Sequence, residues 1–359
     1  MGVGKRITVA VLLGGESVEH DVSVCSGLNV LDALDPERFA GRPIYIDRGG
    51  EWHFGRRPAA PVLAGAPGET AAAAAPSASS RTAQPPTEGT FERLRAPGLD
   101  VVFVALHGPG GEDGTVQGLL SLADVPYTGS GVLASALAMD KARTKRHLRG
   151  LGVPVPDDVL VRHTQGDSAS LSAAIDRIGL PCVVKPVASG SSVGVYIVRH
   201  PTELAAALEA GAVEGEPLLV ESYLEGVEVT CGVLGGGREP AQPLPLTEIR
   251  PPDGQFFDFR AKYTTGGCRE ITPAEVEDQT AARVQELAVM AHEALGCEGM
   301  SRSDFILSTA GPMMLELNTI PGMTETSLLP QGAAAAGISF AALVERLIHS
   351  ALLRAGRLQ

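Results

Sequence analysis

The apolar residues at the start of the chain predict a buried strand followed by an amphipathic helix. Residues 6–13 are almost entirely apolar and end at a glycine turn, residues 14–17. From about Glu19 onward, four apolar residues recur at the spacing of one helical face: Val22, Cys25, Leu28 and Leu31. A strand, a glycine turn and a helix in this order are the usual beginning of an α/β domain.

A second apolar run precedes the most glycine-dense turn of the chain. Residues 100–106 read Asp-Val-Val-Phe-Val-Ala-Leu, and residues 107–114 read His-Gly-Pro-Gly-Gly-Glu-Asp-Gly. α/β folds place their ligands at the carboxyl ends of buried strands. We therefore expect a binding site at His107 and the turn that follows it.

The element pattern divides the chain into three units of an α/β fold with α+β parts. Residues 1–130 predict an N-terminal substrate-binding α/β domain, in which residues of about 58–89, rich in Ala, Pro, Ser and Thr, predict a mobile insertion. Residues 131–224 predict a central unit, and residues 225–359 a C-terminal catalytic unit whose residues of about 250–272 form a lid loop. No internal repeat is visible.

Two helix starts are predicted in the last unit. Thr272-Pro273-Ala274-Glu275 has the form of a capping box with proline at the first helical position, followed by an apolar face with Val284, Leu287, Ala291 and Leu295. Ser339 predicts the cap of a final helix. Its apolar stripe comprises Phe340, Leu343, Val344, Leu347, Ile348 and Ala351.

Composition narrows the class of protein. A chain of 359 residues with a hydrophobic fraction of 44% is long enough for two or three domains with real cores, and no apolar run reaches the ~20 residues that span a bilayer. Its net charge of −13 argues against nucleic acid as a partner. Its five cysteines are scattered without a CxxC pair, which fits a reducing cytoplasm and predicts neither disulfides nor a structural zinc site.

A small-residue loop next to a lysine is a candidate phosphate site. Lys185 ends a predicted strand, and residues 186–194 continue with Pro-Val-Ala-Ser-Gly-Ser-Ser-Val-Gly. Small residues let backbone N–H groups close over phosphates while the lysine adds a point charge. A plain hairpin accounts for the loop equally well. Lys141 is either a second phosphate lysine or a surface lysine.

Two acids at the end of the next predicted strand form a candidate nucleoside site. Residues 218–228 place Glu221, Leu224 and Glu228 in the order acid, apolar residue, acid. Such a segment can line an adenine slot and reach a ribose diol. The alternative is a pair of solvated carboxylates.

Hard oxygen ligands gather on two predicted strands near the C-terminus. Asp304 lies on one strand, and Glu316 and Asn318 lie on the next, where their i, i+2 spacing directs both to one face. Carboxylate and amide oxygens suit Mg²⁺ that bridges polyphosphate oxygens. These residues follow a phosphate-type loop and an adenine-type segment in order, which favours a metal site over two unrelated acids and an amide.

Three segments together resemble the D-alanine:D-alanine ligase family of ATP-grasp enzymes, and the resemblance extends from about residue 6 to 352. They are residues 14–23, 106–114 and 316–324. The resemblance implies a three-domain ATP-grasp architecture with an N-terminal Rossmann-like domain. It also implies a cytoplasmic homodimer that joins two D-alanines through an acyl phosphate, with ADP formation, for peptidoglycan precursor synthesis.

The resemblance implies two groups of residues for the nucleotide and its metals. ATP would bind to Lys141, Lys185, Ser192, Glu221, Leu224 and Glu228. Two Mg²⁺ ions, or Mn²⁺ in their place, would bind to Asp304, Glu316 and Asn318.

It also implies the residues that hold the amino acids. Glu19 would bind the ammonium of the first D-alanine with His107 nearby, and Ser191 would link Glu19 to Tyr263. The second amino acid would be positioned by Lys262, Ser327 and Leu328, and the oxyanion stabilised by Arg302 and the Gly322 amide.

The lid segment departs from the common pattern of the family. Residues 256–263 carry Phe257 and Phe259 where many members have tyrosines, and Arg260 where an acid is usual. Phe257 and Phe259 keep D-serine as acceptor and a specialised peptide pathway open, and D-lactate is a further alternative for the acceptor. A non-catalytic ATP-binding module is the alternative outside the enzymes, and the intact ligand set argues against it.

Overall fold

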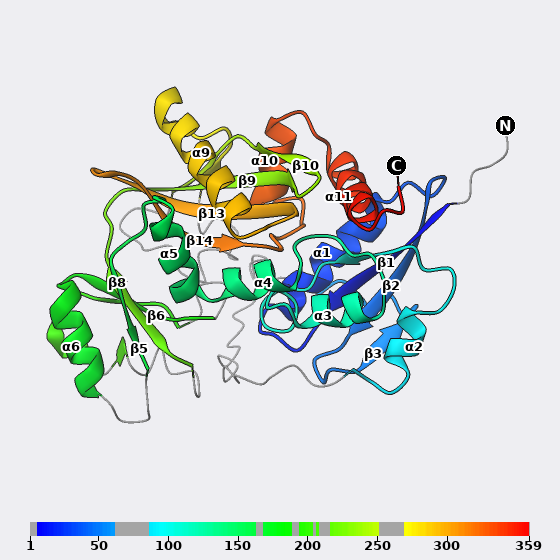
Figure 1. Ribbon diagram of the computed structural model, residues 1–359, viewed down its shortest axis with the longest axis horizontal. Helices are drawn as coiled ribbons and strands as arrows, with labels where there is room; N and C mark the ends of the chain where they lie inside the picture. Colours follow the sequence, from blue (N-terminus) through cyan, green and yellow to red (C-terminus); the bar gives the residue numbers. More distant parts are fainter. Residues whose placement is uncertain are drawn as a thin grey trace, which may run out of the picture.

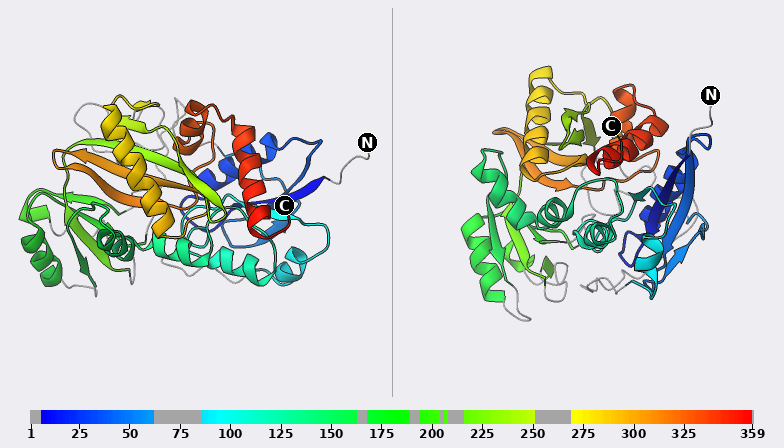
Figure 2. Two further views of the ribbon diagram at one scale, coloured as in Figure 1. Left: turned by 45° about the horizontal axis from the view of Figure 1, so that its top comes forward. Right: turned by 45° about the vertical axis from the view of Figure 1, so that its right-hand side comes forward.

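The chain folds into three β-sheets, and the computed structural model describes residues 6–61, 86–162, 168–188, 194–203, 206–207, 216–250 and 269–358. The N-terminal sheet lies at one end of the molecule, the sheet of β5, β6 and β8 lies at the other, and the sheet of β9, β13 and β14 lies between them (Figures 1 and 2). Helices α4 (Val132–Met139) and α5 (Lys141–Gly150) connect the two ends. Most of the predicted insertion, residues 62–85, and the lid residues 251–268 lie outside the described part.

The N-terminal sheet has the strand order β3-β2-β1-β4. β1 (Ile7–Gly14) pairs in parallel with β2 (Phe39–Ile46) and β4 (Val101–Val104), while β3 (Trp52–Phe54) is an antiparallel edge. Helices α1 (His20–Ala33), α2 (Thr90–Leu94) and α3 (Thr115–Leu122) connect or follow these strands. The strands and the first helix predicted from the apolar pattern are confirmed, with small shifts at their ends.

A glycine is required where β1 ends. Gly14 has φ +95°, and a Cβ atom there would lie 2.1 Å from the carbonyl oxygen of Ile46. The left-handed backbone turns the chain sharply from β1 toward α1. This turn brings Glu19 to the carboxyl ends of β1 and β4.

The middle sheet is antiparallel throughout and has the order β5-β8-β6-β7. Its strands are β5 (Asp158–Val161), β8 (Leu218–Ser222), β6 (Cys182–Pro186) and β7 (Tyr196–Val198). Helix α6 (Ser168–Ile178) packs on it through Leu171, Ala174 and Ile175, and a short 3-10 helix covers Pro201–Glu203.

The third sheet follows the order β12-β11-β9-β13-β14, with β10 paired to β9. All its pairs are antiparallel. Its strands are β9 (Val227–Gly236), β10 (Glu239–Pro243), β11 (Thr247–Arg250), β12 (Arg269–Ile271), β13 (Gly299–Ser308) and β14 (Gly311–Asn318). Helices α9 (Asp278–Ala294), α10 (Leu328–Ala335) and α11 (Phe340–Arg354) accompany it.

The start predicted for the helix after residue 272 is wrong. α9 begins at Asp278 after Glu277, and Glu277 makes no side-chain cap. The predicted box residues bond to the sheet instead: the Thr272 hydroxyl lies 2.7 Å from that of Thr247, and the Glu275 N–H donates to Glu248. The predicted apolar face of the helix is nevertheless buried, through Val284, Leu287, Ala291 and Leu295.

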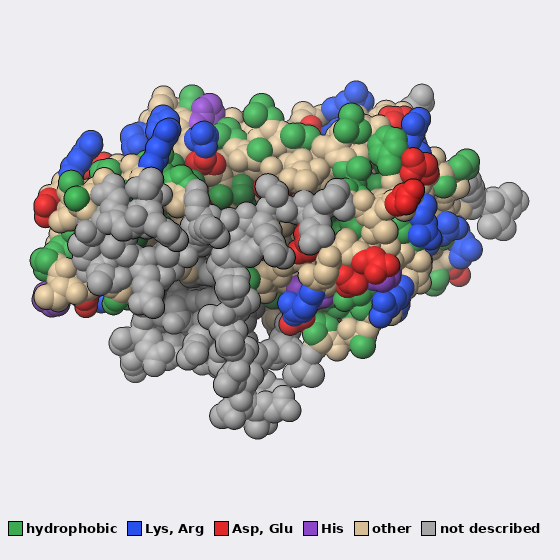
Figure 3. Space-filling view, turned by 90° about the horizontal axis from the view of Figure 1, so that it is seen from below, with side chains coloured by type: hydrophobic (Ala, Val, Ile, Leu, Met, Phe, Trp, Pro, Cys, Tyr) green, Lys and Arg blue, Asp and Glu red, His purple; other side chains and the backbone are tan. Residues whose placement is uncertain are grey.

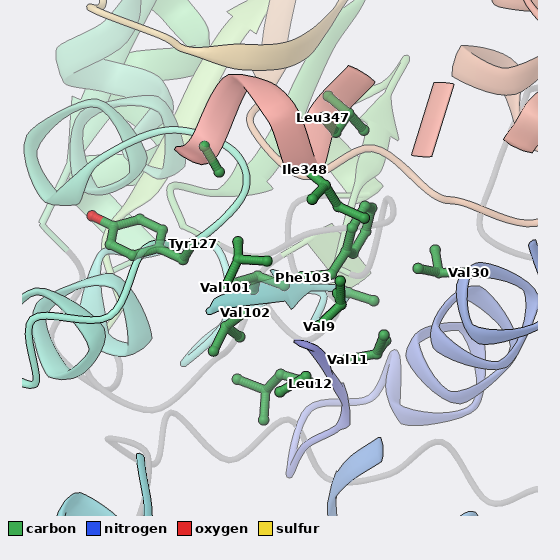
Figure 4. Close-up of a cluster of buried hydrophobic side chains, with 14 of the residues drawn as sticks. Val9, Val11, Leu12, Val30, Val101, Val102, Phe103, Tyr127, Leu347 and Ile348 are labelled. Carbon is green, nitrogen blue, oxygen red and sulfur yellow. The ribbon is translucent and has the colours of Figure 1, made fainter. Parts of the chain in front are cut away.

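The final helix packs into the same core as the N-terminal sheet. Ser339 caps α11 by accepting the Ala342 N–H at 3.3 Å, as predicted. In Figure 4, Leu347 and Ile348 face the side of the sheet from which Val9 and Phe103 project. Residues from the first and last elements of the chain thus share one hydrophobic core.

No single helix in the described ranges is long and apolar enough to cross a membrane. α10 and α11 reach that length only as a pair, and the two are bent by 103° relative to each other. On the face drawn in Figure 3, the described acidic and basic side chains are interspersed.

Candidate active site

Four polar side chains of β13 and β14 lie on one face of the third sheet. Arg302 is paired with Asn318, and Asp304 with Glu316, in the register of the two strands. Paired residues, and residues two positions apart on a strand, point to the same side. The structure therefore brings the two acids and the amide together, and Asn318 Nδ2 lies 3.4 Å from Asp304 Oδ2.

Positive and polar groups surround the two acids. Arg302 donates from Nε and Nη2 to the two oxygens of Asp304, both at 2.9 Å. The Thr230 hydroxyl of β9 donates to Asp304 Oδ1 at 2.8 Å, and Lys141 Nζ lies 3.4 Å from Glu316 Oε2. Glu228 lies two residues before Thr230 on β9, so it faces the same side.

This donor set fits Mg²⁺. Asp304 and Glu316 supply carboxylate oxygens and Asn318 an amide oxygen, which are the hard ligands that Mg²⁺ prefers. In the structure the two carboxylates lie against the Arg302 and Lys141 cations, so positive charge already balances them. Besides these two cations, the same face can bind a divalent cation, together with the phosphates whose charge that cation neutralises.

A buried acid lies between two lysines on the inner strands of the middle sheet and helix α5. Glu221 of β8 contacts Lys185 of the neighbouring strand β6 through Oε1 and Lys145 of α5 through Oε2. All three residues are buried. Burial lowers the pKa of Lys145, and the positive charge of Lys185 lowers it further. Leu224 is half-buried in the connection from β8 to β9.

Two carboxylates flank the glycine turn of the N-terminal sheet. A Cβ atom on Gly108 would lie 2.8 Å from Glu19 Oε2, and the Gly108 N–H donates to Glu112 Oε2 at 2.8 Å. Gly108 has φ +73°, so only a residue without a side chain leaves room for Glu19 here. Burial, reinforced by the charge of Glu19, raises the pKa of Glu112 to about 8.

His107 connects the N-terminal sheet to the loop after β14. Its Nδ1 lies 3.1 Å from the Ile320 carbonyl oxygen, and its Nε2 lies 3.1 Å from Ser26 Oγ, which accepts the Met323 N–H at 3.2 Å. Burial lowers the pKa of His107 to about 4, so the ring is neutral near pH 7. Because a carbonyl only accepts, Nδ1 carries the proton and Nε2 accepts from Ser26. Both ring nitrogens thus have protein partners.

The loop after β14 leads into the start of α10. A Cβ atom on Gly322 would lie 2.8 Å from Ser327 Oγ, so the loop runs close to the helix start. The Ser327 hydroxyl accepts the Thr324 N–H at 3.1 Å, and Leu328 is the first residue of α10. A helix N-terminus favours anionic groups such as a carboxylate.

The two halves of the site face each other. The charge of Arg302 on β13 lowers the pKa values of both His107 and Glu112 of the N-terminal turn. Glu112 is further stabilised in its ionised form by the Ile320 backbone, which belongs to the loop after β14. Glu112 of the N-terminal turn therefore lies within electrostatic range of both Glu19 and Arg302 of the third sheet.

Comparison with known proteins identifies the family. The model of the D-ala D-ala ligase N-terminus matches residues 8–130, and that of the D-ala D-ala ligase C-terminus matches residues 148–349. A D-alanine:D-alanine ligase of Syntrophobacter fumaroxidans is 43% identical over 97% of this chain and 98% of its own length. The chain belongs to the D-alanine:D-alanine ligase family.

Solved structures of ligases confirm the predicted three-domain ATP-grasp architecture. The VanG D-Ala:D-Ser ligase of Enterococcus faecalis superposes with a TM-score of 0.79 at 30% identity, covering 97% of this chain and all of its own. The D-alanine:D-alanine ligase of Bacillus anthracis, solved in complex with ATP, gives a TM-score of 0.74 at 30% identity, covering 98% and 99% of the two chains. The family is ATP-dependent and ADP-forming.

Four predicted site residues of this ligase lie outside the described part of the chain: Ser191, Ser192, Lys262 and Tyr263. Two buried residues for which no individual role was predicted, Glu112 and Lys145, lie within the site. Glu112 stands in a turn that draws notice for its glycines. Lys145 stands in a helix in which half of the residues are Lys or Arg, where a lysine normally faces solvent.

Proposed function

We propose that the protein catalyses ATP-dependent joining of two D-alanines to D-alanyl-D-alanine, with release of ADP and phosphate, for peptidoglycan precursor synthesis. The observation that carries the proposal is the acid, amide and guanidinium face of β13 and β14, opposite Glu19 and the turn after β4. A non-catalytic ATP-binding module has no need for this convergence of Arg302 with Asp304, Glu316 and Asn318.

The nucleotide would lie between the middle and third sheets. Glu221 can accept a hydrogen bond from the adenine amino group beside Leu224, and Glu228 can accept from the ribose hydroxyls. Lys141 and Lys185 carry the positive charge for the phosphates, with Ser192 of the loop after β6. Lys141 already lies against Glu316, which puts a phosphate lysine beside the ligand set.

Two Mg²⁺ ions would be held by Asp304, Glu316 and Asn318, and Mn²⁺ can replace them. Bound there, the metals would neutralise charge on the phosphate oxygens during transfer. Arg302 and the Thr230 hydroxyl hold the Asp304 carboxylate in a fixed orientation through three hydrogen bonds. The protein's own contribution is thus a ligand set that needs little rearrangement.

The reaction would proceed in two steps. The carboxylate of the first D-alanine attacks the γ-phosphate of ATP, forming an acyl phosphate and ADP. The amine of the second D-alanine then attacks the acyl carbon, the C–O bond to phosphate breaks, and the amine loses a proton. Both steps spread negative charge, which positively charged and N–H groups stabilise.

Residues around the amino acids would have separate tasks. Glu19 would bind the first ammonium, with Ser191 and Tyr263 connected to it. Arg302 and the Gly322 amide would stabilise the oxyanion of the second step. Lys262, Ser327 and Leu328 would hold the second carboxylate, where the start of α10 offers backbone N–H groups. His107, whose two nitrogens contact Ser26 and Ile320, would hold the Gly322 loop in place.

D-serine is the second candidate for the acceptor. The D-Ala:D-Ser ligase of Enterococcus faecalis is as similar in structure as the D-alanine ligases are. Arg260, Phe257 and Phe259 of the predicted lid differ from the common pattern. We expect a homodimer in the cytoplasm, with no nucleic acid or membrane as partner.

An acceptor panel tests the proposal. Phosphate release would be measured with ATP, Mg²⁺ and D-alanine alone, or with D-alanine plus D-serine, D-lactate or L-alanine, and products identified by mass spectrometry. We expect release that requires both Mg²⁺ and D-alanine, and D-alanyl-D-alanine as main product. Phosphate release at the full rate without D-alanine would refute the ligase assignment. D-alanyl-D-serine as the main product would identify D-serine, not D-alanine, as the acceptor.

A further inference from the structure

Lys145 is a buried lysine that the proposed reaction does not use. It lies on α5, one helical turn after Lys141, with only 1% of its surface exposed. Its ammonium contacts one oxygen of Glu221, while Lys185 contacts the other. One carboxylate therefore has two lysine partners in a part of the protein that excludes water.

Two lysines on one buried acid exceed what charge balance requires. A single lysine neutralises Glu221, and burying a second lysine beside it adds desolvation cost, which is also the main reason that the pKa of Lys145 is lowered. The negative charges of Asp158 and Glu316 raise the pKa of Lys145, but burial and the charge of Lys185 lower it more. The arrangement is therefore more costly than a single ion pair unless one lysine leaves Glu221 during function.

Lys185 is the lysine that can leave. It is the second-last residue of β6, and in the proposed function its ammonium binds a phosphate. Lys145 approaches Glu221 from the other side, on a helix that is tied to the segment after β6 by the Lys141 N–H and the Val187 carbonyl oxygen at 3.1 Å. When Lys185 turns away, Lys145 stays.

We propose that Lys145 is a positioning residue for adenine recognition: it keeps Glu221 ionised and oriented toward the adenine amino group while Lys185 binds phosphate. This inference rests on the proposed function, in which Glu221 binds adenine and Lys185 binds the phosphates. An ionised carboxylate only accepts hydrogen bonds. It therefore binds the 6-amino group of adenine and rejects hypoxanthine, which has a 6-oxo acceptor in the same place.

The test measures nucleotide discrimination in the full-length protein. Binding of ADP and of inosine diphosphate, with Mg²⁺, would be measured by calorimetry for the native protein and for Lys145→Met. In Lys145→Met we expect ADP affinity to fall at least about 10-fold while inosine diphosphate affinity changes little. The ratio of ADP affinity to inosine diphosphate affinity should therefore also fall about 10-fold. In D-alanine-dependent phosphate release, the KM for ATP should rise more than kcat falls. An unchanged affinity ratio would overturn the proposal.

Repeating the substitution in the Glu221→Gln variant distinguishes a role of Lys145 in positioning Glu221 from a role in packing. With Glu221→Gln there is no acid for Lys145 to hold, so adding Lys145→Met should change ADP affinity less than about 2-fold and leave or raise the melting temperature. If Lys145→Met alone does not fold, folding of the double variant would attribute the loss to the unpaired Glu221 carboxylate, as proposed, and failure of both variants to fold would contradict the proposal. Equal losses in both backgrounds would show that Lys145 acts independently of Glu221, which contradicts the proposal.

Two controls complete the design. Arg143→Met removes a cation of the same helix whose side chain is 69% exposed and paired only with Asp140 among the contacts described, so nucleotide discrimination should not change. The native protein must release phosphate with D-alanine. If it does not, the proposed function fails, whereas an intact reaction with an unchanged ADP to inosine diphosphate ratio in Lys145→Met defeats only the inference about Lys145.

Discussion

At the scale of single residues, the most unusual group is the Glu112 carboxyl. It is buried in the turn after β4, near Glu19, and accepts the Gly108 N–H. Ionising a second acid beside Glu19 without water is unfavourable, which is why the pKa of Glu112 rises from the usual 4.5 to about 8. A protonated Glu112 adds no second negative charge beside Glu19, the residue proposed to bind the substrate ammonium.

The pKa of Glu112 makes stability depend on pH with a definite sign. The folded protein binds this proton more tightly than the unfolded chain, so unfolding free energy should fall as pH rises from about 4.5 to about 8. Glu112→Gln keeps an acceptor for Gly108 but cannot ionise, and its melting temperature should fall less over about pH 6 to 8.5. Equal slopes for the two proteins would contradict a raised pKa.

The ligand residues of β14 allow a second prediction. Glu316→Gln keeps the size of the side chain but weakens it as a metal ligand, so kcat should fall at least about 100-fold and the Mg²⁺ concentration for half-maximal rate should rise. The melting temperature should change little, because the Glu316 side chain is 22% exposed. Glu325→Gln in the exposed turn before α10 is the control. A normal Mg²⁺ dependence in Glu316→Gln would remove Glu316 from the ligand set.

The direction of a side chain could be predicted from the sequence where it depends only on neighbouring residues. Glu316 and Asn318 point to the same side because strands alternate with period two, and this is visible in the letters alone. Lys145 and Glu112 are different, because their environment is made by segments far away in the chain. Nothing within α5 indicates that Glu221, 76 positions later, will lie against Lys145.

At the scale of elements, the contact between α1 and the loop after β14 joins the two halves of the site. Ser26 accepts the Met323 N–H and bonds His107. Three positions earlier, Ser23 accepts the Gly14 N–H and donates to the Ala105 carbonyl, both at 2.8 Å. Both serines are fully buried on α1, but only Ser26 reaches the loop that carries Gly322.

These two serines form a matched pair for mutation. Ser26→Ala and Ser23→Ala should each destabilise the fold by about 1 to 2 kcal/mol, since each leaves buried groups without a partner. Only Ser26→Ala should also lower kcat, by about 10-fold, because the loop with the oxyanion amide loses its anchor. Melting temperature and steady-state rates measure the two effects. Equal kcat values for both variants would show that the anchor has no catalytic consequence.

The capping box predicted at residues 272–275 does not form, because tertiary contacts engage its side chains. A capping box needs its threonine and glutamate for the helix, whereas Thr272 bonds to Thr247 and Glu275 bonds to Arg250 of β11. These two side chains bond to residues of β11 and not to the N–H groups at the start of α9. The buried face of α9 was predictable because its period of 3.6 does not depend on the exact start.

At the scale of the whole molecule, the insertion is the segment whose removal we expect to matter least. Its composition offers few apolar residues to bury, so deletion of residues 64–84, bridged by a short Gly/Ser linker, should leave kcat and melting temperature nearly unchanged. The deletion must stop before Thr87, whose hydroxyl accepts the Trp52 N–H at 3.0 Å. Loss of folding after this deletion would mean that the insertion contributes to a core.

Thr87→Val is the control for the boundary of the deletion. It removes the acceptor of the Trp52 N–H and should cost about 1 kcal/mol of stability with normal activity. If the deletion of residues 64–84 lowers the stability no more than Thr87→Val does, the inserted residues contribute little to a core, as their composition predicts.

The packing of α11 on the first sheet has a consequence for synthesis on the ribosome. Val9 and Phe103 need Leu347 and Ile348 as partners, yet translation at ~5–20 residues per second delivers the last helix roughly 15 to 65 s after the first strand. During that interval one apolar face of the nascent N-terminal sheet lacks its final cover. The newly made chain is then a candidate client for chaperones, and messages truncated before Ser339 should yield products that aggregate rather than shorter ligases.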